Sequence, residues 1–133
     1  MHGTGIDHIK HYIPIDGQAD AIEFYSDTLG FSIEGMTAYE SGEKPFFSIR
    51  ISSGSVLHLE PDPKFIKPDR TAADHIAIRV AESMEVIETT LIDGDIEIDR
   101  RLTPRGATGI APAVYVTDPF GYRVEIKSEQ QSD

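Results

Sequence analysis

Apolar and polar residues alternate along the chain in two groups of segments that follow the same order. Residues 6–15 and 74–80 are rich in β-branched residues with a period of two, which predicts strands. In residues 18–29 and 82–93 the apolar residues recur at helical spacing and a glycine follows, which predicts helices. Three further strands are expected after each helix, at 31–39, 45–52 and 55–60, and at 95–101, 111–117 and 122–127. The pattern therefore predicts a βαβββ unit that occurs twice.

An internal repeat relates the two groups. The tripeptide Asp7-His8-Ile9 recurs 67 residues later, from 7 to 74, as Asp74-His75-Ile76. Without any gap, the same shift places Leu57 on Val124 in the last predicted strand of each group. Self-similarity at a fixed spacing indicates duplicated structural units.

The repeat defines the domain organisation that we expect. Module one spans residues 6–60, module two spans 74–128, and together they form a single domain over 1–133. The segment 61–73 contains three prolines and no periodicity, so it is predicted to link the modules. Because each module alone is too small to bury an adequate core, we expect the two to pair in an α+β fold. The helices would lie outside, and the sheets would curve around a shared cavity.

Strand alternation selects four residues on the cavity side of the predicted sheets. His8 and His75 lie in the first strand of each module, and His58 and Glu125 lie in the last. The shift of 67 that carries His8 to His75 also carries His58 to Glu125. Imidazole and carboxylate groups are ligands for Zn, Ni, Fe, Co and Mn, and such sites suit a catalytic metal. We therefore predict one divalent metal ion, of undetermined identity, bound by these four residues.

Other polar residues are weaker candidates for this site. His11 competes with His8 as a ligand, but its position in the alternation places it on the helix side and outside the repeat register. His2 is expected in a frayed terminus. Phe46 and Phe47 are expected to be core residues. Side chains that could line the cavity and orient a substrate are Lys10, Tyr12, Glu60, Arg79 and Tyr115.

Composition excludes several functional classes. The formal net charge is −11, with 23 acidic and 12 basic residues, which argues against nucleic acid as a partner. The chain has no cysteine, so disulfides and thiolate chemistry are excluded, and no apolar run is long enough to span a bilayer. The first residues do not have the pattern of a secretory signal, so a cytoplasmic location is expected.

Two motifs resemble the vicinal oxygen chelate superfamily of glyoxalases, extradiol dioxygenases and bleomycin resistance proteins. The first is Phe24-Tyr25 followed by Leu29-Gly30-Phe31, and the second is the segment 118–122 (DPFGY) leading to Glu125. The resemblance implies paired βαβββ modules that hold a divalent metal with their first and last strands. It also implies a small-molecule substrate and a homodimer, with the site built within one chain or across two.

Carried over to this sequence, the family pattern matches His8, His75 and Glu125 as ligands. His58 occupies a position that is Glu in bacterial glyoxalase I, so this chain departs from the glyoxalase pattern there. In glyoxalase-like enzymes a ligand carboxylate acts as the base; here Glu125 or His58 would be the catalytic base, and His58 could serve as ligand or base. The resemblance implies a metal-dependent lyase or isomerase acting on a substrate that chelates the metal through adjacent oxygens.

Two alternative functions remain open from the sequence. His8, His75 and Glu125 form a two-histidine, one-carboxylate set, which is typical of Fe(II) dioxygenases of the extradiol type. A bleomycin-type resistance protein would sequester a cationic drug without catalysis, and the acidic composition favours that reading.

Overall fold

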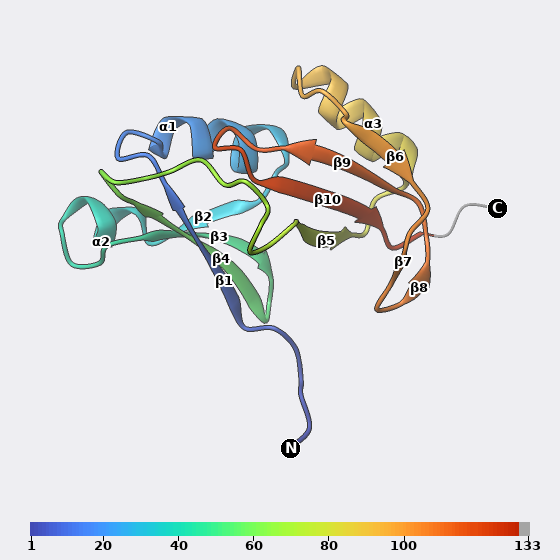
Figure 1. The fold of residues 1–133 in the computed structure, drawn as a ribbon, viewed down its shortest axis with the longest axis horizontal. Helices are drawn as coiled ribbons and strands as arrows, with labels where there is room; N and C mark the ends of the chain where they lie inside the picture. Colours follow the sequence, from blue (N-terminus) through green and yellow to red (C-terminus); the bar gives the residue numbers. More distant parts are fainter. Residues whose placement is uncertain (131–133) are drawn as a thin grey trace. The chain divides into compact units, whose positions relative to one another are not determined.

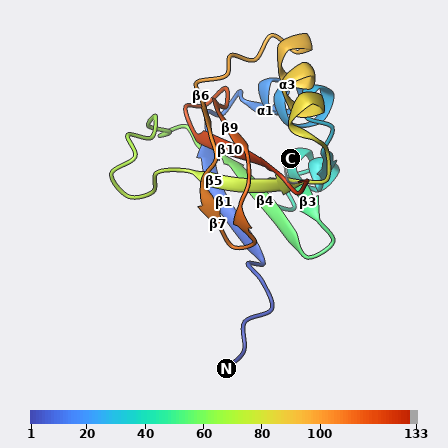
Figure 2. The same cartoon turned by 90° about the vertical axis from the view of Figure 1, so that its right-hand side faces the viewer.

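The computed structural model describes residues 1–130 and divides into two compact units, Met1–Ile66 and Lys67–Asp133. The boundary between the units falls inside the segment 61–73. Each unit contains its own four-stranded mixed sheet (Figure 1). Residues 1–7 extend away from the first strand in both views (Figures 1 and 2).

The first unit follows the predicted βαβββ order, with one short helix inserted. Its sheet has the strand order β1-β4-β3-β2, in which β1 pairs parallel with β4 and the other pairs are antiparallel. The elements are β1 (His8–Ile13), α1 (Gln18–Ala21), η1 (Ile22–Thr28), β2 (Ser32–Glu34), α2 (Met36–Glu40), β3 (Phe47–Ser52) and β4 (Ser55–Pro61).

The second unit has the same order with a small hairpin inserted. Its sheet has the order β5-β10-β9-β6, and again only the first and last strands, β5 and β10, pair parallel. Figure 2 shows helix α3 to one side of β9 and β10. The elements are β5 (Ile76–Val80), α3 (Met84–Asp93), β6 (Arg100–Leu102), β7 (Arg105–Gly106), β8 (Gly109–Ile110), β9 (Ala113–Thr117) and β10 (Arg123–Ser128). The α+β fold class is confirmed.

After the shift of 67 residues the pairings β1–β4 and β3–β4 match β5–β10 and β9–β10, whereas the outer pair β6–β9 differs from β2–β3 by one residue. Lys10 pairs with His58 across β1 and β4, and the shifted positions Ala77 and Glu125 pair across β5 and β10. The repeat seen in the sequence is therefore a repeat of hydrogen-bond register. Residues of the first, third and last strands that are related by the shift therefore occupy equivalent places in their sheets.

Alternating residues of these strands form the core of each unit. In β4 the side chains of Leu57 and Leu59 are buried, whereas those of Val56, His58 and Glu60 are only half-buried. In β1 the same alternation buries Ile13 and leaves Lys10 exposed. The face that carries His8 and His58 is therefore the face opposite the core, as the alternation predicted.

The first predicted helix is present but changes type partway along its length. After α1 the chain continues as the π-helix η1, where the Leu29 N–H donates to the Phe24 carbonyl five residues earlier. Phe24 and Tyr25 are both buried, with ring centroids 4.8 Å apart. Consecutive side chains of an α-helix are about 100° apart, and the wider π turn brings these two rings closer to one face.

The predicted strand 31–39 is wrong over its second half. Strand β2 ends at Glu34 because Gly35 has φ 76°, a left-handed conformation that leaves the sheet. The following residues form α2, beginning with the Tyr39 N–H donating to the Gly35 carbonyl at 3.0 Å. Met, Ala and Glu in this segment are good helix formers, and the sequence pattern was too short to show it.

The predicted strand 95–101 is also mostly wrong. At the end of α3 the Ile96 N–H donates to the Leu91 carbonyl, and Asp95 has φ 57°. This helix-terminating turn uses residues that had been assigned to the strand, so β6 begins only at Arg100. The hairpin β7–β8 was not predicted, because each of its strands is only two residues long.

Candidate metal and substrate site

The first unit brings together two of the predicted ligands, His8 from β1 and His58 from β4. Their ring centroids lie 4.7 Å apart at an angle of 44°. His8 follows the exposed N-terminal segment and its side chain is 50% exposed, whereas His58 is half-buried. Two imidazoles on neighbouring parallel strands can supply two nitrogen ligands to one ion.

The second unit brings together the other two predicted ligands. His75 lies immediately before β5, and its Nε2 is 3.2 Å from Oε1 of Glu125 in β10. The Glu125 side chain is only 6% exposed, and that of His75 is 31% exposed. A nitrogen and a carboxylate oxygen at this separation can share a metal ion between them.

An aspartate orients the first histidine of each pair. Nδ1 of His8 is 2.7 Å from Asp7 Oδ2, and Nδ1 of His75 is 2.7 Å from Asp74 Oδ2. The hydrogen bond to the histidine lowers the pKa of each aspartate, so both carboxylates accept the imidazole proton. This fixes the proton on Nδ1 and presents Nε2 as the lone-pair donor, which is how carboxylate–histidine pairs serve metal sites.

A residue of the next strand contacts the second member of each pair. Ser48 Oγ in β3 lies 2.6 Å from Nδ1 of His58, and the Tyr115 hydroxyl in β9 donates to Glu125 Oε1 at 2.6 Å. Ser48 and Tyr115 are themselves related by the shift of 67, from 48 to 115. Both half-sites therefore have the same four-position design with different side chains at two of the positions.

These surroundings change the acid–base behaviour of two groups. Burial, and then the hydrogen bond to Glu125, raises the pKa of Tyr115 to about 12. Burial, followed by the charge of His8, lowers the pKa of His58 below its ordinary value. At neutral pH Tyr115 is thus a permanent donor to Glu125, and His58 is a neutral imidazole that can bind a metal or accept a proton.

The structure places the four predicted ligands in two pairs, one in each unit. Among residues 1–130, no three His, Cys, Asp or Glu side chains gather as metal ligands. Each unit thus offers two of the predicted ligands. The donor set of imidazole nitrogens and a carboxylate fits Zn, Ni, Fe, Co or Mn.

The residues that were expected to orient a substrate differ between the units. Lys10 Nζ and Glu60 Oε1 form an ion pair at 2.8 Å on the face that carries His58. In the second unit Lys127 takes the place of Glu60, and its buried ammonium group donates to the carbonyls of Pro104 and Gly109. Arg79 is exposed and Phe47 is a core residue.

The two remaining histidines are not on this face. His11 lies on the core side of β1, where burial lowers its pKa below the ordinary value. His2 lies in the exposed segment before β1.

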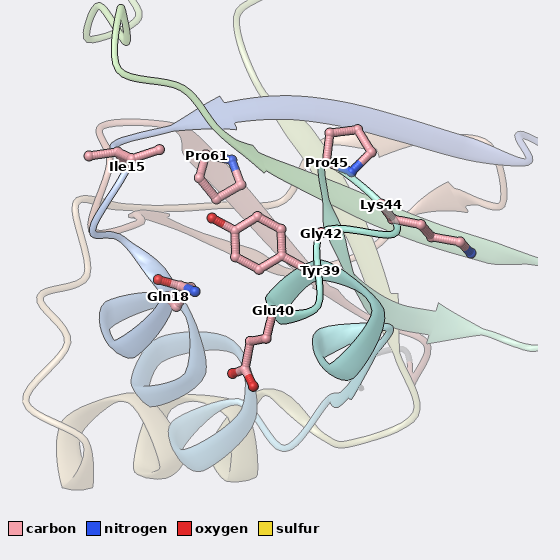
Figure 3. Close-up of a pocket in the computed structure, with 8 residues that line it drawn as sticks. All are labelled: Ile15, Gln18, Tyr39, Glu40, Gly42, Lys44, Pro45 and Pro61. Carbon is pink, nitrogen blue, oxygen red and sulfur yellow. The ribbon is translucent and has the colours of Figure 1, made fainter.

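Lys44 lines two hollows of the first unit. The smaller, of about 380 Å³, adjoins the half-site and is lined by residues that include Lys44, Phe46, Ser48, Arg50, Val56 and His58. The larger, of about 610 Å³, lies between the start of α1 and the segment after α2 (Figure 3). Ile15, Gln18, Tyr39 and Pro61 are among its lining residues.

Several residues of this site were missed in the sequence. Asp7 and Asp74 belong to the repeated tripeptide itself, so the repeat contained the signal for them. Alternation along β3 places Phe46, Ser48 and Arg50 on the face of His58, which could have moved Phe46 from the core to the site. Lys44 has no such signal, because it precedes the strand.

Comparisons with known proteins agree with this architecture. The sequence model of the Glyoxalase/Bleomycin resistance protein/Dioxygenase superfamily matches residues 5–126. Virulence protein STM3117 of Salmonella typhimurium is 27% identical over 122 residues, which cover 91% of this chain and 83% of that protein.

Solved structures share the fold at low sequence identity. A glyoxalase/dioxygenase from Nostoc punctiforme has a TM-score of 0.74 at 23% identity, covering 96% of this chain and 92% of that one. The glyoxalase family protein from Enterococcus faecalis has a TM-score of 0.70 at 19% identity, with 96% and 99% covered. Lactoylglutathione lyase from Agrobacterium tumefaciens has a TM-score of 0.63 at 18% identity, with 96% and 95% covered. No helix within residues 1–130 is long and apolar enough to cross a membrane. The resemblance noted in the sequence is confirmed, and the chain belongs to the Glyoxalase/Bleomycin resistance protein/Dioxygenase superfamily.

Proposed function

We propose that this protein is a metal-dependent lyase or isomerase of the glyoxalase type. Its substrate would be a small molecule that presents two adjacent oxygens to the metal. The observation that carries the proposal is the repeated half-site, in which an aspartate-oriented histidine lies beside a second ligand on the neighbouring strand. A histidine with only a structural role would not require the same aspartate and a second candidate ligand beside it in both units.

The ligands would be His8, His58, His75 and Glu125. When bound, a divalent ion of the kinds that suit this set would stabilise negative charge that develops on a substrate oxygen. Asp7 and Asp74 would hold the two first-strand imidazoles with Nε2 presented, and this orientation costs no rearrangement when the ion binds. Whether the pairs come from one chain or from two chains of a homodimer is open in this proposal.

Two residues of the chain could move a proton next to a carbonyl. Glu125 receives both of its contacts, from Tyr115 and from His75, at Oε1, which leaves Oε2 to act on a substrate. His58 is neutral at pH 7, because its pKa is lowered, and its Nδ1 is engaged by Ser48. A carboxylate or a neutral imidazole within hydrogen-bond reach of the substrate is a competent general base.

The first test is metal content and its dependence on single residues. Protein loaded with Zn²⁺, Ni²⁺, Co²⁺, Mn²⁺ or Fe²⁺ and then desalted should retain one ion per complete ligand set. Glu125→Gln and His8→Gln should each lower the affinity by about 10- to 100-fold or more, which is the loss typical even of supporting residues. His11→Gln is the matched control, because His11 faces the core of the same strand.

The outcomes also separate the roles of His58. If His58→Gln loses the metal, this residue is a ligand; if the metal remains and turnover is lost, it is the base. A protein that retains no divalent ion, and in which Glu125→Gln changes nothing, contradicts the proposal. Oxygen uptake with Fe²⁺ and a catechol would instead identify a ring-cleaving dioxygenase.

A further inference from the structure

The smaller hollow of the first unit lies directly beside the half-site. His58 and Ser48 form part of its wall, so a molecule in the hollow would contact the imidazole that is a candidate ligand or base. Its volume of about 380 Å³ is at the lower end of the range for small-molecule sites. This inference rests on the proposed function for the chemistry at His58 and extends it to the rest of the substrate.

The charges of the lining residues leave one cation uncompensated. Arg50 is held by Glu34 through two hydrogen bonds of 2.9 Å, from Nε to Oε2 and from Nη2 to Oε1, so these two charges cancel. Lys44 is exposed, and no carboxylate of residues 1–130 forms an ion pair with it. In a chain of formal net charge −11 the lining of this hollow is therefore positive at one end.

An aromatic ring lies near both that cation and the half-site. The ring centroid of Phe46 is 4.3 Å from that of His58, at 42°, and the Lys44 ammonium is 6.0 Å from the Phe46 centroid. Phe46 is half-buried, so its ring is fixed by packing and still accessible. His58, Phe46 and Lys44 thus give the lining of this hollow an imidazole, an apolar ring and a cation.

Lys44 lines both hollows, and the charge around it differs between them. Figure 3 shows the Lys44 side chain running away from Tyr39 and Gln18, at the edge of the larger hollow. Glu40 lies on the lining of that larger hollow and carries the opposite charge. An anion is therefore favoured beside Phe46 and disfavoured beside Glu40.

We propose that this pocket selects a small aromatic acid as substrate. Its anionic group would lie at Lys44, its ring against Phe46, and its two adjacent oxygens on the side opposite the anion, next to His58. A charge-assisted contact with an ammonium group in a partly enclosed pocket is stronger than a neutral hydrogen bond. A cationic drug would meet Lys44 as a like charge, so the pocket does not favour sequestration of such a compound.

The test compares two probes that differ only in charge. 3,4-Dihydroxybenzoate carries two adjacent oxygens and an anionic group across the ring, and 3,4-dihydroxybenzamide is its neutral counterpart. Calorimetric titration of the Zn²⁺-loaded protein should show the acid binding about 10-fold more tightly than the amide. Lys44→Gln should reduce this preference to about twofold or less, and Lys44→Arg should restore most of it.

A matched control removes the same charge elsewhere in the unit. Lys64→Gln also removes one cation, from an exposed position outside the pocket, and should leave the preference for the acid unchanged. Phe46→Leu should weaken the acid and the amide by the same factor, because it removes the ring and not the charge. Equal binding of the two probes, binding of neither, or a preference that survives in Lys44→Gln would overturn the inference.

The same titration in the presence of a chelator keeps this inference separate from the proposed function. Without metal both probes should bind more weakly, while the ratio between acid and amide stays the same. Loss of any metal dependence with an intact ratio would contradict the metal chemistry and leave the anion site standing. Retained metal dependence without a preference for the acid would contradict the anion site at Lys44 and leave the metal chemistry standing.

Discussion

Replacing Tyr115 with phenylalanine tests whether the buried carboxylate of the second unit depends on its neighbour. Tyr115 and Glu125 are 7% and 5% exposed, and the hydroxyl donates to Oε1 at 2.6 Å. Because burial and this hydrogen bond raise the pKa of Tyr115 to about 12, the donor is present throughout the neutral range. Phenylalanine has nearly the same shape, so Tyr115→Phe removes the hydrogen bond without leaving a cavity.

The size of the loss follows from the kind of hydrogen bond removed. Hydrogen bonds to charged groups contribute about 1.5–3 kcal/mol, and a buried carboxylate that loses its donor gains no water in exchange. We expect the free energy of unfolding of the metal-free protein at pH 7 to fall by about 2 kcal/mol. Urea unfolding followed by far-ultraviolet circular dichroism measures this change and does not depend on tyrosine fluorescence.

Tyr39→Phe is the matched control for this substitution. The Tyr39 ring packs edge-on against Phe47 with centroids 5.8 Å apart, and no hydrogen bond from its hydroxyl lies within residues 1–130. Its removal should change the free energy of unfolding by no more than about 0.5 kcal/mol. If the two variants lose the same stability, the Tyr115–Glu125 hydrogen bond has no special weight and the reasoning is refuted.

Three further predictions concern other parts of the two units. Burial lowers the pKa of His11, so the folded protein resists protonation of this imidazole. The free energy of unfolding should therefore fall as the pH drops below about 6.5, where the unfolded state binds the proton. In His11→Gln, urea unfolding should show a smaller fall of this free energy between pH 7 and 5. Lys127→Met removes the donor to the Pro104 and Gly109 carbonyls and should speed amide hydrogen exchange over 103–111, whereas Lys64→Met should not. Gly30→Ala should lower the free energy of unfolding by about 1–2 kcal/mol because Gly30 has φ 86° and an added Cβ there meets open space. Gly54→Ala, which also meets open space but has no positive φ, should cost less, and equal losses would contradict this reading.

The repeat made most of the fold predictable from the sequence. Strand alternation and the shift of 67 predict which residues of the first and last strands share a face, and the observed pairs Lys10–His58 and Ala77–Glu125 are related by that shift. The errors lie where the modules differ in local conformation. Gly35 and Asp95 both adopt positive φ, and each ended or delayed a strand that hydrophobicity alone had continued.

The candidate site was predictable in its ligands and not in its surroundings. His8, His58, His75 and Glu125 could be selected because the repeat relates them in pairs. Among the surrounding residues, Asp7 and Asp74 are identical in the two modules, whereas Ser48 and Tyr115 share a repeat position without chemical similarity. Lys44 could not be found at all, since a residue before a strand has no predictable direction.

The chemical difference between the two half-sites is the feature that separates the roles of Glu125 and His58. Their backbones have the same register, so the difference lies in the side chains alone. Glu125 is nearly fully buried, and its Oε1 is fixed by a phenol that stays protonated at neutral pH, which suits a ligand held in one position. His58 is less buried, stays neutral because its pKa is lowered, and forms part of the wall of a hollow that a substrate could enter. A duplicated module whose two copies were equivalent would offer two identical acid–base groups; here the pair provides one fixed carboxylate and one imidazole beside Phe46 and Lys44. Under the proposed function, Glu125 therefore suits the role of a ligand and His58 that of the base which acts on the substrate.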